Sequence, residues 1–208
     1  MKQIRSVQTL ENFGRTRLSQ NFFMRDFLYS EIANFSRISN LPADPDLAIA
    51  AGKMLCVELL EPLNSTFGRI AIRSSYRSEA VNQFGNEHGF NCGSNESNYA
   101  GHIWDRRDAQ GRMGATACIV IPWFADRYEQ GADWRSLAWW MHDHLPYSSM
   151  YFFPKLCAFN LTWSENPERT IKSYIEPKGT LTKHGNANHG GSHAEFYQDF
   201  PELKTAQL

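Results

Sequence analysis

Ala115-Thr116-Ala117-Cys118-Ile119-Val120-Ile121 is the stretch that says most about the fold class. It is apolar, contains several β-branched residues and has no charged side chain. A short apolar run of this kind is typical of a strand that lies inside a sheet. We therefore expect a buried strand here, with the rest of the domain built around it.

Strand-like segments flank this stretch on both sides. After it, aromatic and β-branched residues form three short runs, which follow a tryptophan-rich helix expected over 133–144. Short runs of such residues, bounded by turn signals, are typical of strands. The expected strands outside 115–121 are 69–73, 101–105, 149–153, 157–163 and 170–175.

Helical signals dominate the first part of the chain. Apolar residues recur at near-helical spacing over 22–35. A second helix is expected to begin at the N-cap Asp44, with Pro45 at its first position, and to end before Pro62. Ser78 is expected to cap a third helix. Helices that precede strands are typical of the α+β class, so we expect a small antiparallel sheet with N-terminal helices.

The overall composition fits one globular domain with a tail. The 208 residues carry a formal net charge of -1, without the basic excess of nucleic-acid-binding proteins. No apolar run approaches the roughly 20 residues that span a bilayer. Residues 1–20 lack the apolar segment of a signal peptide, so we expect a cytoplasmic protein without membrane contact. We divide the chain into a domain at 1–176 and a polar, Gly- and His-rich tail at 177–208; the oligomeric state is not fixed by the sequence.

Four segments carry a resemblance to a known family. They are, in order, Leu18-Ser19-Gln20-Asn21-Phe22, Leu60-Glu61-Pro62-Leu63, Ile72-Arg73-Ser74-Ser75-Tyr76-Arg77-Ser78 with Asn82, and Ser97 to Asp105. Their order and spacing resemble those of the zinc D-Ala-D-Ala carboxypeptidases, which act on peptidoglycan. The resemblance covers roughly residues 18–163 and implies the Hedgehog/DD-peptidase fold.

The same resemblance places the family's metal ligands on this chain. The family has a zinc-binding His three residues before a Gly and a zinc-binding Asp four residues after it. With Gly101 as that Gly, these positions hold Asn98 and Asp105. The third ligand, a His on a late strand, aligns best with Asn160. Only Asp105 is therefore kept as a candidate metal ligand, and Arg77 matches the family's clamp for the substrate carboxylate.

Two asparagines at zinc positions change the chemistry that such a site supports. Asn offers a neutral amide oxygen, whereas zinc favours imidazole nitrogen and thiolate. Two amides and one carboxylate form an oxygen set that suits calcium or magnesium better. We therefore expect no zinc at the family site and keep another divalent cation as an alternative. Amide hydrolysis is expected to be lost, because no zinc-bound water would ionise near neutral pH.

Other histidines offer ways to rebuild a reactive site. His102 lies three residues before Asp105, which on a strand places the two side chains on opposite faces. His142 and His144 lie at a helix end and diverge by about 200° around its axis. Either could supply one metal ligand or a general base, and the alternative role for the pair is an interaction with the helix dipole. Three further histidines in the tail could chelate a metal: His184, His189 and His193.

The late strand is expected to form one wall of a cleft. By alternation over 157–163, large apolar side chains share one face, and small or polar ones, including Asn160, share the other. The second face leaves room for a ligand. We expect Asn98, Asp105 and Asn160 to converge there, with Arg77 nearby. The other candidate ligand-binding residues are Ser75, Tyr76, Asn82 and His102.

Three functions are compatible with these patterns. The first, which we expect, is a divergent protein that has lost zinc peptidase activity and binds a small polar or peptide-like ligand in the cleft. The second is a metal-dependent enzyme with a rewired site. The third is a zinc D-Ala-D-Ala carboxypeptidase, or another peptidoglycan peptidase, whose ligands lie elsewhere in the sequence. The candidate catalytic residues are Arg77, Asp105, His142 and His144.

Overall fold

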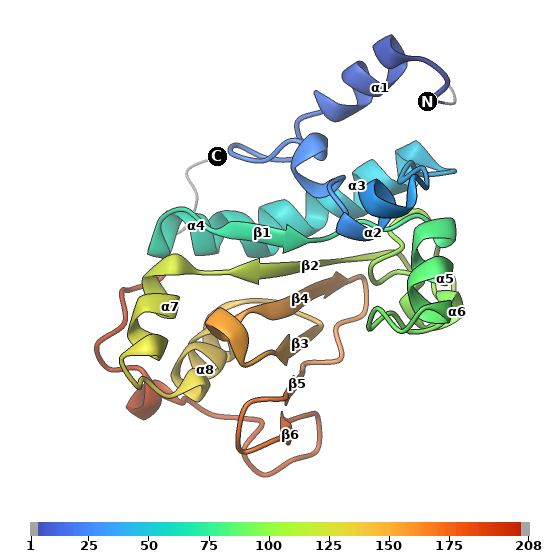
Figure 1. Cartoon of the computed structure of the whole chain (residues 1–208). Coiled ribbons are helices and arrows are strands. Elements are labelled where there is room, and N and C mark those ends of the chain that lie inside the picture. The colour runs from blue at the N-terminus through green and yellow to red at the C-terminus, as the bar shows by residue number, and fades with distance from the viewer. Residues whose placement is uncertain (1–3, 205–208) are drawn as a thin grey trace.

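A six-stranded open sheet organises the molecule (Figure 1). The computed structural model describes residues 4–204, so residues 1–3 of the expected domain and 205–208 of the expected tail lie outside the described residues. The strands are β1 (Ala71–Ser74), β2 (Gly114–Val120), β3 (Ser149–Phe152), β4 (Phe159–Ser164), β5 (Thr170–Ser173) and β6 (Gly179–Thr182). In the sheet they follow the order β1-β2-β4-β3-β5-β6. The protein is thus a mixed α and β fold around one sheet.

One pair of neighbouring strands is parallel, which corrects the prediction of an antiparallel sheet. β3 pairs with β5 in parallel, whereas the other four pairs are antiparallel. After β4 the chain turns back and joins the sheet on the far side of β3. Because β4 is antiparallel to β3, a strand that reverses the direction of β4 must run parallel to β3.

Helices cover one face of the sheet. α3 (Pro45–Leu55) and α8 (Trp134–His144) contribute buried residues to the same core as Phe159 and Leu161 of β4, and both lie behind the sheet in Figure 1. On the other face of β4, Asn160 is half-buried, so the predicted alternation is confirmed over 159–163. Cys157 and Ala158 precede the strand and are both buried, so the alternation does not extend to them. The other α-helices are α1 (Val7–Gly14), α2 (Glu31–Ser36), α4 (Glu61–Phe67), α5 (Glu79–Glu87), α6 (Asn95–Asn98) and α7 (Pro122–Glu129).

The segment 22–35 forms two short helices instead of the single helix predicted. A 3-10 helix, η1 (Met24–Phe27), precedes α2. Ser30 separates them, because its hydroxyl oxygen accepts a hydrogen bond from the Ala33 N–H (3.2 Å) and caps α2. An N-cap residue has an extended backbone and cannot continue the preceding helix. The apolar spacing was misleading because Phe27 and Ala33 are both buried although they belong to different helices.

The helix that begins after Asp44 does not end before Pro62. Its N-cap is confirmed, since the Asp44 side chain accepts from the Leu47 N–H (3.1 Å). α3 then runs through a π-helical segment, η2 (Cys56–Leu60), into α4. Proline lacks an N–H and its ring presses on the carbonyl four residues earlier. The wider π turns directly before Pro62 relieve that contact, so the helix continues.

Residues 101–105 form turns, so the prediction of a strand there is wrong. The N–H groups of Gly101 and Ile103 both donate to the Asn98 carbonyl oxygen, at 2.9 and 3.0 Å. Ile103 and Trp104 are both fully buried, whereas successive residues of a strand point to opposite faces. The apolar pair belongs to a turn that is folded into the core.

The remaining predicted elements are present with small shifts in their bounds. The segment 115–121 corresponds to β2, whose residues are all buried. Ser78 caps α5, as its hydroxyl oxygen accepts from the Val81 N–H (3.3 Å). The helix over 133–144 is α8, and the three late strands are β3, β4 and β5. The sequence did not predict α1, α6, α7 or β6.

The described part of the tail is folded against the domain. β6 pairs with β5, so the expected boundary after residue 176 falls inside a pair of neighbouring strands. Farther along, the centroid of the Phe200 ring lies 5.1 Å from that of Trp123. The Trp140 indole N–H donates to the Pro201 carbonyl oxygen (3.1 Å). The tail therefore covers apolar residues of the domain instead of standing free in solvent.

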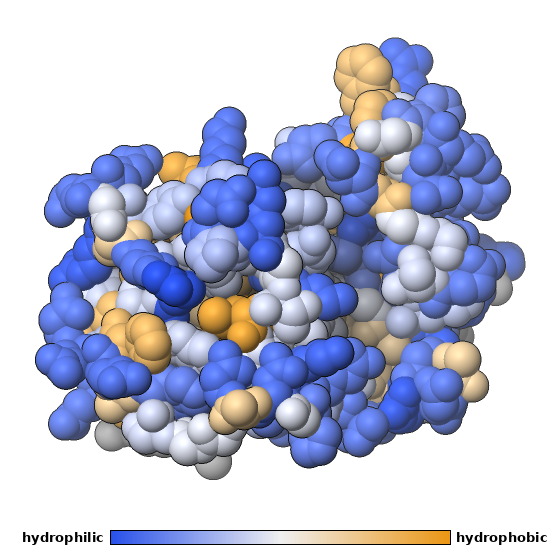
Figure 2. Space-filling view, turned by 90° about the horizontal axis from the view of Figure 1, so that it is seen from below, coloured by the Kyte–Doolittle hydropathy of each residue, from blue (hydrophilic) through white to orange (hydrophobic). Residues whose placement is uncertain are grey.

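The face of the molecule that Figure 2 shows is mostly hydrophilic. The view from below in Figure 2 shows hydrophobic residues in small patches that are surrounded by hydrophilic ones. Within residues 4–204, no helix has both the length and the apolar character needed to cross a membrane.

Candidate functional site

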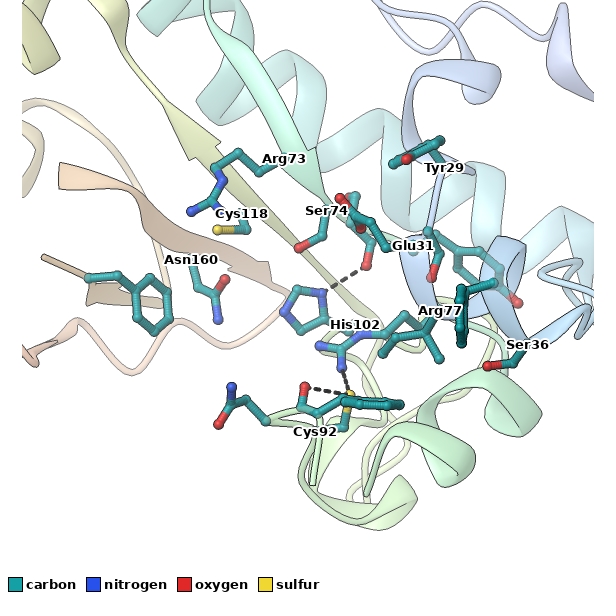
Figure 3. A pocket seen from close by; sticks show the side chains of 18 residues that line it. Tyr29, Glu31, Ser36, Arg73, Ser74, Arg77, Cys92, His102, Cys118 and Asn160 are labelled. Atoms are coloured by element: carbon teal, nitrogen blue, oxygen red, sulfur yellow. Dashed lines mark hydrogen bonds between the residues drawn. The ribbon is translucent and has the colours of Figure 1, made fainter. Parts of the chain in front are cut away.

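The open face of the sheet carries a cavity of about 700 Å³ (Figure 3). β1, β2, β4 and the segment after β1 supply one side, and α2 with the loop at 90–92 supplies the other. Five of the predicted site residues line this cavity: Ser75, Tyr76, Arg77, His102 and Asn160. Arg77 and Asn160, which were expected to lie near each other, thus line the same cavity.

Strand pairing places Cys118, and not Asp105, beside Asn160. β2 and β4 pair Cys118 with Asn160, and β1 and β2 pair Ser74 with Cys118. These three residues form a row across the strands at the cavity. In Figure 3 the side chains of Cys118 and Asn160 lie on one side of the His102 ring, and Arg77 lies on the other.

Arg77 extends into the cavity without a carboxylate partner. Its backbone N–H donates to the His102 carbonyl oxygen (2.8 Å), and its Nη1 lies 2.6 Å from the Cys92 sulfur. Its Nε is buried and has no hydrogen-bond partner, and no ion pair to Arg77 occurs within residues 4–204. Burial lowers the pKa of Arg77, and the neighbouring Cys92 sulfur offsets part of this effect. The guanidinium group is therefore a half-buried cation whose buried Nε donor is unused.

His102 is buried beside Arg77 in its neutral form. Its Nδ1 lies 2.8 Å from the Ser75 carbonyl oxygen, which can only accept, so Nδ1 carries the proton. Burial, and next the charge of Arg77, lower the pKa of His102 to about 3. The Ser75 carbonyl and the Asn160 side chain favour the charged ring and offset part of this shift. At neutral pH, Nε2 is therefore an unprotonated acceptor.

Ser75, Tyr76 and Asn82 hold the site in shape. The Ser75 hydroxyl donates to a backbone carbonyl oxygen of β2 (3.1 Å), and the buried Tyr76 hydroxyl donates to Oδ1 of Asp105 (3.1 Å). The Asn82 Nδ2 group donates to the Gly93 carbonyl oxygen (3.0 Å) and fixes the loop that follows α5. Asn82 does not line the cavity, so its contribution is to position this loop.

Asp105 faces α3 and does not line the cavity. Its Oδ2 accepts from the Ala43 backbone N–H (2.7 Å) just before α3, and its Oδ1 accepts from the Tyr76 hydroxyl (3.1 Å). The Asp105 side chain is buried, and both of its oxygens are engaged. The carboxylate thus anchors the start of α3 to the turns at 101–105, which removes it from the predicted metal-ligand set.

Asn98 also lies outside the cavity. Its Nδ2 group donates to the carbonyl oxygen of Ser94 (2.9 Å), within the turn that forms α6. The predicted convergence of Asn98, Asp105 and Asn160 is therefore wrong. The cause is the turn structure at 101–105, which points His102 into the cavity and Asp105 toward α3.

His142 and His144 lie at the end of α8, away from this cavity. The His142 Nε2 donates to the His189 carbonyl oxygen (2.9 Å), and its Nδ1 lies 2.6 Å from the Tyr147 hydroxyl. Burial lowers the pKa of His142, which keeps the ring neutral. The His144 Nδ1 lies 2.7 Å from the Trp140 carbonyl oxygen. Both rings complete hydrogen bonds at the end of this helix.

One group of potential metal-ligand atoms lies close together in the part of the chain that the structure describes. Atoms of His142, Asp143 and His193 lie within 4.8 Å of one another. The His193 Nδ1 lies 2.7 Å from Asp143 Oδ1, and its Nε2 lies 3.0 Å from the Asn188 carbonyl oxygen. Every ring nitrogen of the two histidines is therefore already hydrogen-bonded. The arrangement ties the tail to α8, and none of the three residues lines the cavity.

Arg73 and Cys118 also line the cavity, and the sequence patterns did not single them out. Cys118 stands in an apolar run and is typical of a core residue; only the pairing of β2 with β4 places it beside Asn160. A signal did exist for Arg73, because a charged residue within a strand has to face away from the core. Because Arg73 belongs to β1, its side chain then has to lie on the open face of the sheet.

Comparisons of the chain with protein-family models, with curated proteins and with solved structures found no match.

Proposed function

We propose that this protein is a divergent DD-peptidase-like binding protein without zinc peptidase activity. It binds a small polar or peptide-like ligand in the cavity on the open face of the sheet, through the carboxylate of that ligand. The observation that carries the proposal is Arg77, a half-buried cation whose Nε is fully buried without a hydrogen-bond partner and which has no carboxylate partner within the described residues.

A ligand carboxylate would supply what Arg77 lacks. A buried charge without a partner is unfavourable, and a carboxylate can accept two parallel hydrogen bonds from one guanidinium group. Arg73 adds a second positive charge to the lining, and the Asn160 amide adds a neutral donor. The His102 ring is neutral and adds no charge to the lining.

The donors in the cavity do not fit the family's zinc site. Asn98 and Asp105 are engaged elsewhere, and Asn160 offers only an amide. Within residues 4–204, the group of three ligand atoms found within 4.8 Å of one another lies at α8 and not in this cavity. Carboxylate binding by arginine, in contrast, needs no metal. These placements support binding over hydrolysis.

The proposal is tested by comparing a ligand with and without its carboxylate. The probes are an N-acetylated dipeptide with a free C-terminus and the same dipeptide as its C-terminal amide, titrated calorimetrically into the full chain. We expect the carboxylate form to bind at least about tenfold more tightly, which is about 1.4 kcal/mol. Arg77→Gln is expected to abolish this difference. Equal binding of both forms would contradict the proposal.

Arg69→Gln is the matched control. Arg69 is exposed, does not line the cavity and forms no ion pair within residues 4–204. The substitution removes the same charge from the molecule, so it reports any general electrostatic effect. If Arg69→Gln weakened binding as much as Arg77→Gln, the effect would come from net charge and not from the cavity.

A metal-dependent enzyme with a rewired site is the second candidate. It is favoured by one observation, that His102 and Cys118, which carry zinc-type donor atoms, both line the cavity. Metal analysis of the purified full chain, together with an assay for release of D-Ala from a D-Ala-D-Ala peptide, separates the candidates. We expect no stoichiometric zinc and no release. One zinc per chain with zinc-dependent release would overturn the binding proposal.

A further inference from the structure

Aromatic side chains gather at the mouth of the cavity. Tyr29, Phe35 and Phe90 line it although 59%, 90% and 49% of their surfaces are exposed. Phe153, which is half-buried and packs against a small apolar cluster that includes Cys118, is a further aromatic lining residue. Single exposed apolar residues are ordinary, but several around one cavity mark a binding surface.

The position of Phe90 is fixed by its neighbours. Its ring centroid lies 6.3 Å from that of Phe84 and 6.2 Å from that of His88, and these two rings stack on each other at 3.9 Å. Its backbone N–H donates to the Gly85 carbonyl oxygen at the end of α5 (2.8 Å). These contacts hold Phe90 at the cavity before a ligand binds, so little conformational entropy is lost by this side chain on binding.

The residues that line the cavity differ in exposure. Arg77 is half-buried with its Nε fully buried, whereas Tyr29, Phe35 and Phe90 are exposed, as is the second lining cation, Arg73. The only acidic side chain among the lining residues is Glu31, which is exposed. A ligand that matches this pattern has one negative group at its inner end and an apolar body next to it.

Resting on the proposed function, we infer that the cavity selects carboxylates whose adjoining side chain is aromatic, such as the C-terminus of a peptide that ends in phenylalanine. The carboxylate pairs with Arg77, and the side chain packs against Phe35 and Phe90. Removing two aromatic surfaces from water together stabilises the complex. A ligand that has a carboxylate but no adjoining side chain would contact Arg77 alone.

Three small probes distinguish the contribution of the Arg77–carboxylate contact from that of the aromatic contact. They are N-acetylphenylalanine, N-acetylglycine and N-acetylphenylalaninamide, titrated into the ¹⁵N-labelled full chain and followed by chemical-shift changes. We expect N-acetylphenylalanine to bind at least about tenfold more tightly than either other probe. N-acetylglycine loses the aromatic contact, and the amide loses the contact with Arg77.

Substitution of the mouth residues tests the inference without touching Arg77. Phe35→Ser and Phe90→Ser are each expected to lower the preference for N-acetylphenylalanine over N-acetylglycine by about threefold or more. Each substitution removes one of the two aromatic rings that contact the ligand side chain, and a change of this order corresponds to the loss of one partial ring contact. Binding of N-acetylglycine itself should not change. Val7→Ser is the control, because Val7 is 84% exposed on α1 and does not line the cavity. It should leave both affinities unchanged.

The outcomes distinguish this inference from the proposed function. If N-acetylglycine and N-acetylphenylalanine bind equally, the aromatic selectivity is overturned while carboxylate binding stands. If no carboxylate binds, both are overturned. If the phenylalanine amide binds as tightly as the carboxylate, Arg77 is not the anchor, and both are again overturned.

Discussion

His102 links the cavity to the stability of the fold through its protonation. Its folded-state pKa of about 3 lies below the ordinary value of 6.5, mainly because the ring is buried. Between these values the unfolded chain binds the proton and the folded chain does not, so stability is lost as pH falls through this window. From pH 7 to pH 4 the loss from this one group approaches about 3 kcal/mol.

Urea unfolding of the wild type and of His102→Gln at pH 7 and pH 4 measures this loss. Other titrating groups are common to both proteins, so the comparison isolates His102. We expect the stability advantage of the wild type over the variant to shrink by about 2–3 kcal/mol at the lower pH. Parallel pH profiles would show that the ring is not held neutral by burial.

Asp105 makes a structural contribution that can be separated from ligand binding. Its carboxylate accepts from the Ala43 N–H and the Tyr76 hydroxyl in a buried position. Asp105→Ala leaves both donors without a partner, and we expect a loss of about 3 kcal/mol in the free energy of unfolding. The exposed Asp126→Ala is the control and should change stability by less than about 0.5 kcal/mol. A stable Asp105→Ala protein that had lost carboxylate binding would mean that Asp105 belongs to the site.

At the scale of elements, Gly114 allows β2 to pass close to the turns that carry His102. A Cβ atom at this position would lie 2.3 Å from the Ala100 carbonyl oxygen and 2.9 Å from that of Trp163. Both are backbone atoms of neighbouring segments, so neither can rotate away. The close approach also lets the Thr116 N–H donate to the Gly101 carbonyl oxygen (3.0 Å).

Gly114→Ala is expected to lower the free energy of unfolding by about 3 kcal/mol through this overlap. Gly190→Ala is the matched control, because no atom lies within 4 Å of its added Cβ and its backbone is outside the left-handed region. It should stay within about 0.5 kcal/mol of the wild type. Thermal or urea unfolding of both variants measures the difference, and similar stabilities would contradict the close packing of β2.

At the scale of the whole molecule, the tail contributes to the core. The Phe200 ring lies within 5.8 Å of the Phe124 ring and within 5.1 Å of the Trp123 ring. Phe200→Ala should therefore cost about 2 kcal/mol, less than for a fully buried phenylalanine because Phe200 is half-buried. Phe196→Ala, at a tail residue that is 43% exposed, should cost clearly less. Equal effects on urea unfolding would show that the tail does not pack as described.

Local sequence signals predicted most of the elements because they act between neighbours along the chain. Caps such as Ser78 and Asp44 satisfy N–H groups three residues away, and the alternation of β4 follows from strand geometry alone. The same local signals gave wrong predictions at two places. At Pro62 the helix continues, because a π-helical segment relieves the contact between the proline ring and the backbone, and at 101–105 two neighbouring apolar residues are buried in a turn and not in a strand.

The composition of the cavity depended on contacts between distant segments. The sequence pointed to Arg77, His102 and Asn160, and the structure brings these three together. It could not show that Cys118 would stand beside Asn160, because strand register is set by packing across the sheet. Nor could it show that Asp105 would turn toward α3, since that depends on the Ala43 N–H group and the Tyr76 hydroxyl, which other segments bring there. The amino-acid sequence determines the chemistry of each side chain and the local elements. Which side chains meet in one cavity depends on how the sheet and its turns pack, because those contacts join residues that are distant in the sequence.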